Sequence, residues 1–121
     1  MPPGRINIDD PDVDMDAAHR LLYRGLPFTG EVEERSGGHL ISLDTYVDGL
    51  LEGLGREWYE DGTLRSRGRA ASNRAVGIHQ EWHPNGTLAR TQSFSAGGDL
   101  IQDTEWDEHG RPTRSWSAPL P

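Results

Sequence analysis

The 121-residue sequence contains no cysteine, which excludes a disulfide framework and a metal site built on thiolates. Basic residues are few, since 12 Lys and Arg stand against 20 Asp and Glu, for a formal net charge of -8. Surfaces that bind nucleic acid or anionic membranes need clustered Lys and Arg, so we expect neither kind of partner. The negative charge favours a basic protein partner, or it serves solubility alone.

Long hydrophobic runs are also absent. No segment approaches the roughly 18 apolar residues of a membrane-spanning helix. Residues 1–20 lack the apolar centre of a signal peptide, so the sequence predicts a cytoplasmic protein. Hydrophobic residues make up 33% of the chain, too few to fill a thick two-layer core. The fold must therefore be one that is stable with a thin core.

The sequence does contain a repeat with a period of 24 residues. Trp58, Trp82 and Trp106 follow one another at this spacing. A fixed period of this length is typical of stacked repeat proteins, in which each unit packs only on its neighbours. The other positions that recur at the same spacing are Gly62, Gly86 and Gly110, then Leu40, Leu64 and Leu88, and finally Glu33, Glu57, Glu81 and Glu105.

Each unit has the pattern of a β-hairpin. In the loop Pro84-Asn85-Gly86, proline presets the first turn residue, asparagine tolerates the second, and glycine adopts the left-handed conformation of the third. We therefore predict an all-β fold, an antiparallel meander of hairpin repeats that forms one elongated twisted sheet. The hairpins are expected at residues 30–46, 54–70, 78–94 and 102–117, after a capping strand at residues 21–23.

The whole array is expected to be one repeat domain over residues 21–117. The aspartate-rich residues 1–20 are expected to form either an acidic arm or a short capping helix over residues 11–20. Residues 118–121 are expected to be a tail. Because the terminal strands are open sheet edges, we also consider a homodimer formed through an edge.

Side chains alternate between the two faces of a strand, which divides each hairpin into an apolar and a polar side. Pairing outward from the loop places Trp58 opposite Leu64 and Glu57 opposite Arg65. The face with the tryptophans is then expected to include Leu64, Leu88, Ala70 and Phe94. The opposite face is expected to include Glu57, Arg65, His79, Glu81 and His83.

The units at residues 55–64 and 79–88 resemble the MORN-variant repeat, in which an aromatic pair is followed by Asn-Gly or Asp-Gly and then a leucine. Residues 22–30 are also similar to the start of bacterial proteins of this kind. The resemblance covers roughly residues 21–117 and implies an antitoxin of the YwqK type, which binds and neutralises a toxin. It weakens in the terminal units, where Pro112 replaces the leucine and Glu34 the tryptophan.

Two rows of side chains are candidates for contact with a partner. The tryptophan row is either an exposed aromatic platform or simply the apolar filling of the sheet. The glutamate row either presents a line of negative charge to a basic protein or is balanced by solvent and by Arg65. The residues that we predict to bind a partner are Glu57, Trp58, Tyr59, Glu81, Trp82, His83, Glu105 and Trp106.

His79, Glu81 and His83 alternate along one strand, so their side chains point the same way. Two imidazoles and a carboxylate are ligands for a metal, or an acid and base for catalysis. Same-face neighbours on a strand lie about 7 Å apart, too far for easy shared ligation, so we predict no metal site. The glycine pairs fall at hairpin turns, so no phosphate-binding loop and no cofactor is expected.

Two functions from different classes follow. The first is a non-catalytic antitoxin or immunity-type protein that binds a cognate toxin or effector through one face of the sheet. The alternative is a small enzyme with acid-base or cyclase-like chemistry, in which a groove on the sheet lifts the pKa of a carboxylate and His79, Glu81 or His83 acts on the substrate.

Overall fold

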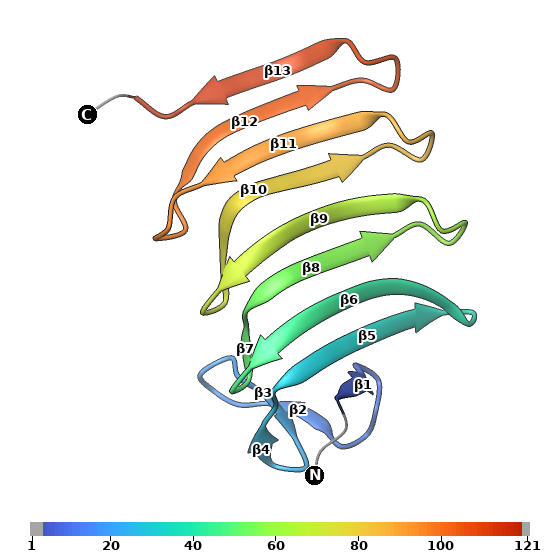
Figure 1. The fold of residues 1–121 in the computed structure, drawn as a ribbon, viewed down its shortest axis with the longest axis vertical. Coiled ribbons are helices and arrows are strands. Elements are labelled where there is room, and N and C mark those ends of the chain that lie inside the picture. Colours follow the sequence, from blue (N-terminus) through green and yellow to red (C-terminus); the bar gives the residue numbers. More distant parts are fainter. Residues whose placement is uncertain (1–3, 120–121) are drawn as a thin grey trace.

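Residues 4–119, the part of the chain that the computed structural model describes, fold entirely into strands and turns (Figure 1). The predicted all-β class is confirmed, and no helix in this range could cross a membrane. The strands are β1 (Arg5–Asn7), β2 (Val13–Met15), β3 (Leu21–Tyr23), β4 (Leu26–Pro27), β5 (Gly30–Ser36), β6 (His39–Val47), β7 (Leu50–Leu51), β8 (Gly53–Trp58), β9 (Leu64–Ala71), β10 (Arg74–Trp82), β11 (Leu88–Phe94), β12 (Leu100–Trp106) and β13 (Pro112–Ser117).

A 10-stranded sheet runs the length of the molecule in the order β1-β5-β6-β8-β9-β10-β11-β12-β13, with the short β7 beside β6. From β5 onward all neighbours are antiparallel, and β5–β6, β8–β9, β10–β11 and β12–β13 are hairpins at the four expected places. Figure 1 shows these strands stacked in chain order. The one parallel pairing joins β1 to β5, which makes the sheet mixed at that edge.

The N-terminal segment is neither a flexible arm nor a helix. Strand β1 extends the large sheet, while β2, β3 and β4 form a second sheet of three strands. The expected capping strand, β3, therefore belongs to this small sheet and does not continue the meander. The aspartates of this segment shape turns, since the Asp10 and Asp16 carboxylates accept backbone N–H groups two residues later. Residues 1–3 and 120–121 of the expected arm and tail lie outside the described range.

The buried core lies at this N-terminal end. Phe28 and Leu21 are each 1% exposed, and the rings of Tyr23 and Phe28 pack edge to face with centroids 6.0 Å apart. Burial of such side chains is what stabilises the contact between the small sheet and the large one. The cluster consists of Ile6, Leu21, Tyr23, Phe28 and Val32.

Each later hairpin loop has the predicted geometry. The bulge that follows the loop, however, moves the side chains after it to the opposite face of the sheet from the one predicted. Trp58 pairs with Leu64 as expected, whereas Glu57 pairs with Ser66, because Arg65 is an extra, unpaired residue. An extra residue shifts the alternation of every side chain after it on the return strand. Ala70 and Phe94 therefore lie on the glutamate face, contrary to the prediction.

The first hairpin departs from the others by one residue. Its loop is the two-residue Gly37-Gly38, with both φ angles positive, and Ser36 pairs with His39. The shorter loop places Glu34, opposite Ser42, in register with Glu57, which also pairs with Ser42. The predicted row member Glu33 instead lies on the other face.

Neighbouring hairpins are joined by side chains that follow each tryptophan position. The Tyr59 hydroxyl donates to the carbonyl oxygen of Trp82 at 2.7 Å, and His83 Nε2 contacts the carbonyl oxygen of Trp106 at 2.8 Å. The equivalent Ser36 hydroxyl donates to Glu60 at 3.1 Å. Tyr59 and His83 therefore hold one hairpin to the next.

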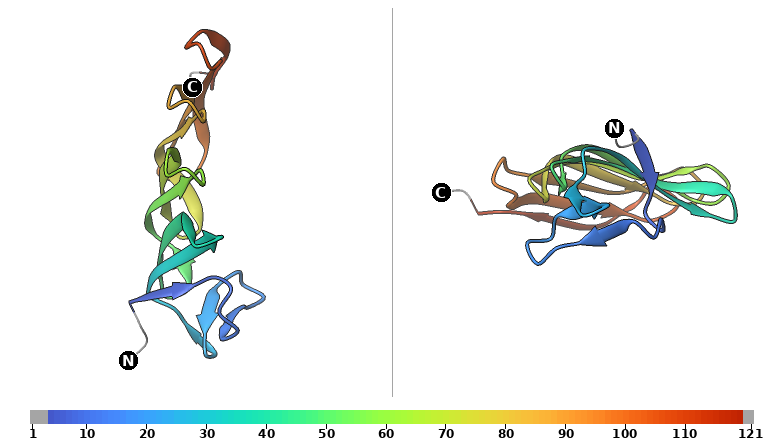
Figure 2. Two further views of the ribbon diagram at one scale, coloured as in Figure 1. Left: turned by 90° about the vertical axis from the view of Figure 1, so that its right-hand side faces the viewer. Right: turned by 90° about the horizontal axis from the view of Figure 1, so that it is seen from below.

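From β8 to β13 the large sheet is a single layer. Figure 2 shows it edge-on as a thin twisted ribbon with the small sheet at one end. None of its strands beyond β6 contains a buried hydrophobic residue, and Asp103 is the buried polar side chain, held by two hydrogen bonds from Arg90 at 2.9 and 2.6 Å.

Candidate functional site

Cross-strand pairing assigns the side chains of the sheet to two faces. The tryptophan face has Trp58, Trp82 and Trp106 with their paired residues Leu64, Leu88 and Pro112. We call the opposite side the groove face. Across it, the first row comprises Glu34, Ser42, Glu57, Ser66, Glu81, Arg90, Glu105 and Arg114, and the second comprises Asp44, Gly55, Gly68, His79, Gln92, Asp103 and Trp116.

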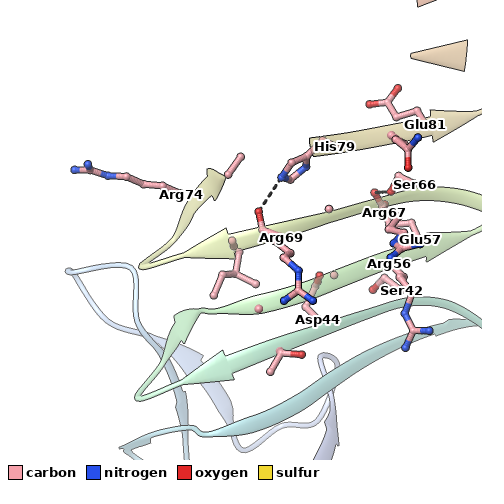
Figure 3. A pocket seen from close by; sticks show the side chains of 18 of the residues that line it. Ser42, Asp44, Arg56, Glu57, Ser66, Arg67, Arg69, Arg74, His79 and Glu81 are labelled. Carbon is pink, nitrogen blue, oxygen red and sulfur yellow. Dashed lines mark hydrogen bonds between the residues drawn. The ribbon is translucent and has the colours of Figure 1, made fainter. Parts of the chain in front are cut away.

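A groove of about 490 Å³ crosses this face between β6 and β10. Its floor is the pair Gly55 and Gly68, which face each other across β8 and β9. A Cβ atom on Gly55 would overlap the Asp44 carboxylate, and one on Gly68 would overlap the His79 imidazole. The two glycines are therefore what allows Asp44 and His79 to lean over the backbone from the strands on either side (Figure 3).

Two contacts hold the His79 ring in place. Its Nε2 atom lies 2.8 Å from the carbonyl oxygen of Arg69, and the ring packs edge to face with Phe94, with centroids 5.1 Å apart. Because a carbonyl oxygen only accepts, Nε2 must carry the proton. In the neutral ring Nδ1 is then an acceptor, and it is the atom that lies over Gly68.

The carboxylates of the groove are close to one another, and Glu81 is paired across the strands with Arg90. Burial raises the pKa of Asp44, and repulsion from Glu57 and Glu34 raises it further. Glu57 accepts a hydrogen bond of 2.7 Å from the Ser66 hydroxyl. Within residues 4–119, none of Glu34, Asp44, Glu57 and Glu81 forms a salt bridge.

Three arginines that border the groove extend their side chains from the opposite face of the sheet. Arg56, Arg67 and Arg69 alternate with Gly55, Glu57 and Gly68 along β8 and β9, so their side chains leave on the tryptophan face. The guanidinium of Arg56 lies over the Trp58 ring there, 5.3 Å from its centroid. The guanidinium groups of these three arginines therefore do not lie among the carboxylates of the groove face.

Replacement of Asp44 by asparagine should stabilise the protein at neutral pH by about 0.3–1 kcal/mol, the size of typical surface charge interactions. The folded-state pKa of Asp44 is raised, so its ionised form destabilises the folded state at every pH above that pKa. The difference should fade as the pH falls below the ordinary value of 3.8, where the carboxyl is protonated in both states. Urea unfolding of both proteins at pH 7 and pH 3 measures it.

The exposed Glu108→Gln provides the matched control for Asp44→Asn, because Glu108 lies in the last hairpin loop, outside the groove. It should leave the free energy of unfolding unchanged at both pH values. A destabilised Asp44→Asn protein at pH 7 would contradict the assignment of Asp44 as a repelled carboxylate.

The sequence-predicted site residues are divided between the two faces. Glu57, Glu81 and Glu105 lie on the groove face, whereas Trp58, Trp82 and Trp106 are half-buried on the other, so one flat partner surface cannot contact both rows. Tyr59 and His83 project from the groove face near the loops, but their polar atoms bond to the next hairpin.

The predicted trio of His79, Glu81 and His83 is only partly brought together. His79 and Glu81 line the main groove, while His83 lines a smaller hollow near the loops with Glu81 and Tyr59. In the described part of the chain no group of three or more His, Asp or Glu side chains is placed to hold a metal ion.

Sequence reasoning missed the centre of the groove. Asp44 is not one of the residues that recur at the 24-residue spacing. Gly55 and Gly68 contribute only the space left by their missing side chains, and no sequence motif identifies such a space. The available signal was the alternation itself. Once the bulge after the loop is counted, Gly55 and Gly68 become partners and His79 falls beside them.

Comparison with known proteins gives no family for the chain. No protein-family model and no curated protein matches it. A chain in the crystal structure of the GtfA/B complex bound to UDP and GlcNAc is similar over 87% of this chain and 28% of that chain, with 14% identity and a TM-score of 0.41. This chain spans less than a third of that protein, and so distant a likeness carries no argument about function.

Proposed function

We propose that the chain is a protein-binding module that docks a cognate basic protein on its groove face. The observation that carries the proposal is a groove on the sheet lined by Glu34, Asp44, Glu57 and Glu81, none of which forms a salt bridge with another residue of the range 4–119. Such a field accelerates and orients the association of a partner of opposite charge.

The resemblance to MORN-variant repeats gives this proposal its finer form, an antitoxin or immunity-type protein that neutralises a bacterial toxin in the cytoplasm. The -8 net charge supports it, because the whole molecule then attracts the same kind of partner as the groove. In this proposal the tryptophan face has a structural role and does not contact the partner. Its three indoles are half-buried, and the Arg56 guanidinium lies over that of Trp58.

The test is a titration with the protein encoded by the neighbouring gene. We expect a complex of about nanomolar affinity, as in other protein complexes of standard size. Glu81→Arg should weaken it about tenfold or more by placing a like charge against the partner. Glu108→Arg, the same charge change outside the groove, is the control. Absence of a complex at low salt would contradict the proposal, and so would a loss caused by Trp82→Ala while Glu81→Arg has no effect.

A second candidate, a small enzyme, is favoured by one observation. Asp44, with its raised pKa, and the acceptor atom Nδ1 of His79 lie over adjacent glycines in a groove, an arrangement that suits proton transfer. It ranks second because Glu57 and Glu81 are exposed to solvent, and catalytic electrostatics are strongest where water is excluded. Turnover that is abolished by Asp44→Asn would favour the enzyme.

A further inference from the structure

Four groups that surround the centre of the groove are hydrogen-bond acceptors. They are the carboxylates of Asp44, Glu57 and Glu81 and the Nδ1 atom of His79, whose proton is held on Nε2 by the Arg69 carbonyl. Two serines lie beside these groups: the Ser66 hydroxyl is donated to Glu57, and Ser42 faces Glu57 across the strand pair. A complementary ligand must therefore carry positive charge and several donors.

The shape of the site narrows the choice of cation. The Asp44 carboxylate and the Nδ1 atom of His79 come from opposite sides and lie where Cβ atoms on the paired Gly55 and Gly68 would be. Paired positions in a sheet have Cβ atoms about 5 Å apart, so one group with donors on both edges can reach both acceptors. A guanidinium is planar and has five N–H donors in a fixed fork, whereas an ammonium is a compact, strongly hydrated point charge.

We infer that the slot formed by the Asp44 carboxylate and the Nδ1 atom of His79, above Gly55 and Gly68, binds the guanidinium of an arginine side chain supplied by the partner protein. This inference rests on the proposed function and names the residue type that its interface recognises. Glu57 and Glu81 lie farther along the same groove, where they contact basic residues that flank the arginine. Arginine is also the cation most enriched at the centres of protein interfaces.

An arginine within a polypeptide fits this site better than the free amino acid. The groove is open along the sheet, so a partner segment can lie across it while one side chain enters the slot. The α-carboxylate of free arginine would face Glu57, Glu81 and Glu34, and like charges repel. The ligand is therefore a peptide-linked guanidinium with no negative charge beside it.

The experiment is a titration of the full, ¹⁵N-labelled chain with N-acetyl-arginine amide at low salt, followed through the amide signals of Gly55 and Gly68. We expect saturable shifts with a dissociation constant of about 1 mM, the scale of a single charged contact. The isosteric but neutral citrulline compound should give no response, and the lysine compound and free arginine should bind at least about fivefold more weakly. Asp44→Asn and Glu57→Gln should each weaken binding about fivefold, while Glu108→Gln should not.

Equal responses to the arginine and citrulline compounds, or to the arginine and lysine compounds, would overturn the inference. So would unchanged binding in both Asp44→Asn and Glu57→Gln proteins that retain a native amide spectrum. Because the titration uses no partner protein, its failure alongside an intact partner complex would overturn the arginine slot alone. Failure of the partner complex alongside a positive titration would instead reject the proposed function.

Discussion

Phe28→Ala is expected to lower the free energy of unfolding by about 3–5 kcal/mol, the range for removing a fully buried aromatic side chain. Phe28 is 1% exposed and packs with Tyr23, Leu21 and Val32 where the small sheet meets the large one. The loss should be localised, because the hairpins from β8 onward make no part of this core. Urea unfolding and amide hydrogen exchange of β3 and β5 together measure it.

Leu26→Ala is the matched control for Phe28→Ala. Leu26 lies two residues away in β4 but is 70% exposed, so its replacement should change the free energy of unfolding by less than about 0.5 kcal/mol. If both variants lose similar stability, the cluster around Phe28 is not the core that joins the two sheets.

Gly49→Ala is expected to destabilise the protein by about 2–5 kcal/mol, from a strained backbone and a steric clash together. Its φ of +83° is one that residues with a side chain rarely adopt. A Cβ atom there would lie 2.9 Å from the carbonyl oxygen of Leu21 and 3.2 Å from its nitrogen. Those atoms belong to the backbone junction between β3 and the β6–β7 turn, where Leu21 N–H donates to the Gly49 carbonyl.

Gly25→Ala separates the two causes. Gly25 has nearly the same φ, +80°, and lies 24 residues earlier at the same turn position, but a Cβ atom would find nothing within 4 Å. Only the backbone strain remains, so the loss should be about 1–2 kcal/mol. Thermal and urea unfolding of both variants give the comparison. Equal losses would show that Gly49 makes no close approach that matters.

The hairpins were predictable because their signals are local. Turn glycines and the 24-residue period fix where the chain reverses, and Gly62, Gly86 and Gly110 all have the left-handed φ that the loop requires. The N-terminal module was not predictable in this way. Its pairing of Ile6 with Val32 joins distant parts of the chain in parallel, and no local pattern encodes that contact.

The candidate site was half predictable for a similar reason. Glu57 and Glu81 were found because they recur, and they do lie on one face. The face of a residue such as Phe94 depends on whether the chain inserts one extra residue after the loop, and a difference of one residue reverses the outcome. The role of Asp44 depends on the arrangement of β6, β8 and β9 side by side, which no local sequence pattern records.

The bonds from Tyr59 and His83 to the next tryptophan carbonyl tie each hairpin only to its immediate successor. An open row of repeats does not have to close into a ring, so the number of hairpin units can vary. Duplication or loss of 24 residues among the later hairpins would lengthen or shorten the ribbon and leave the N-terminal module intact. The extent of the docking surface can thus evolve separately from the part of the chain that anchors it.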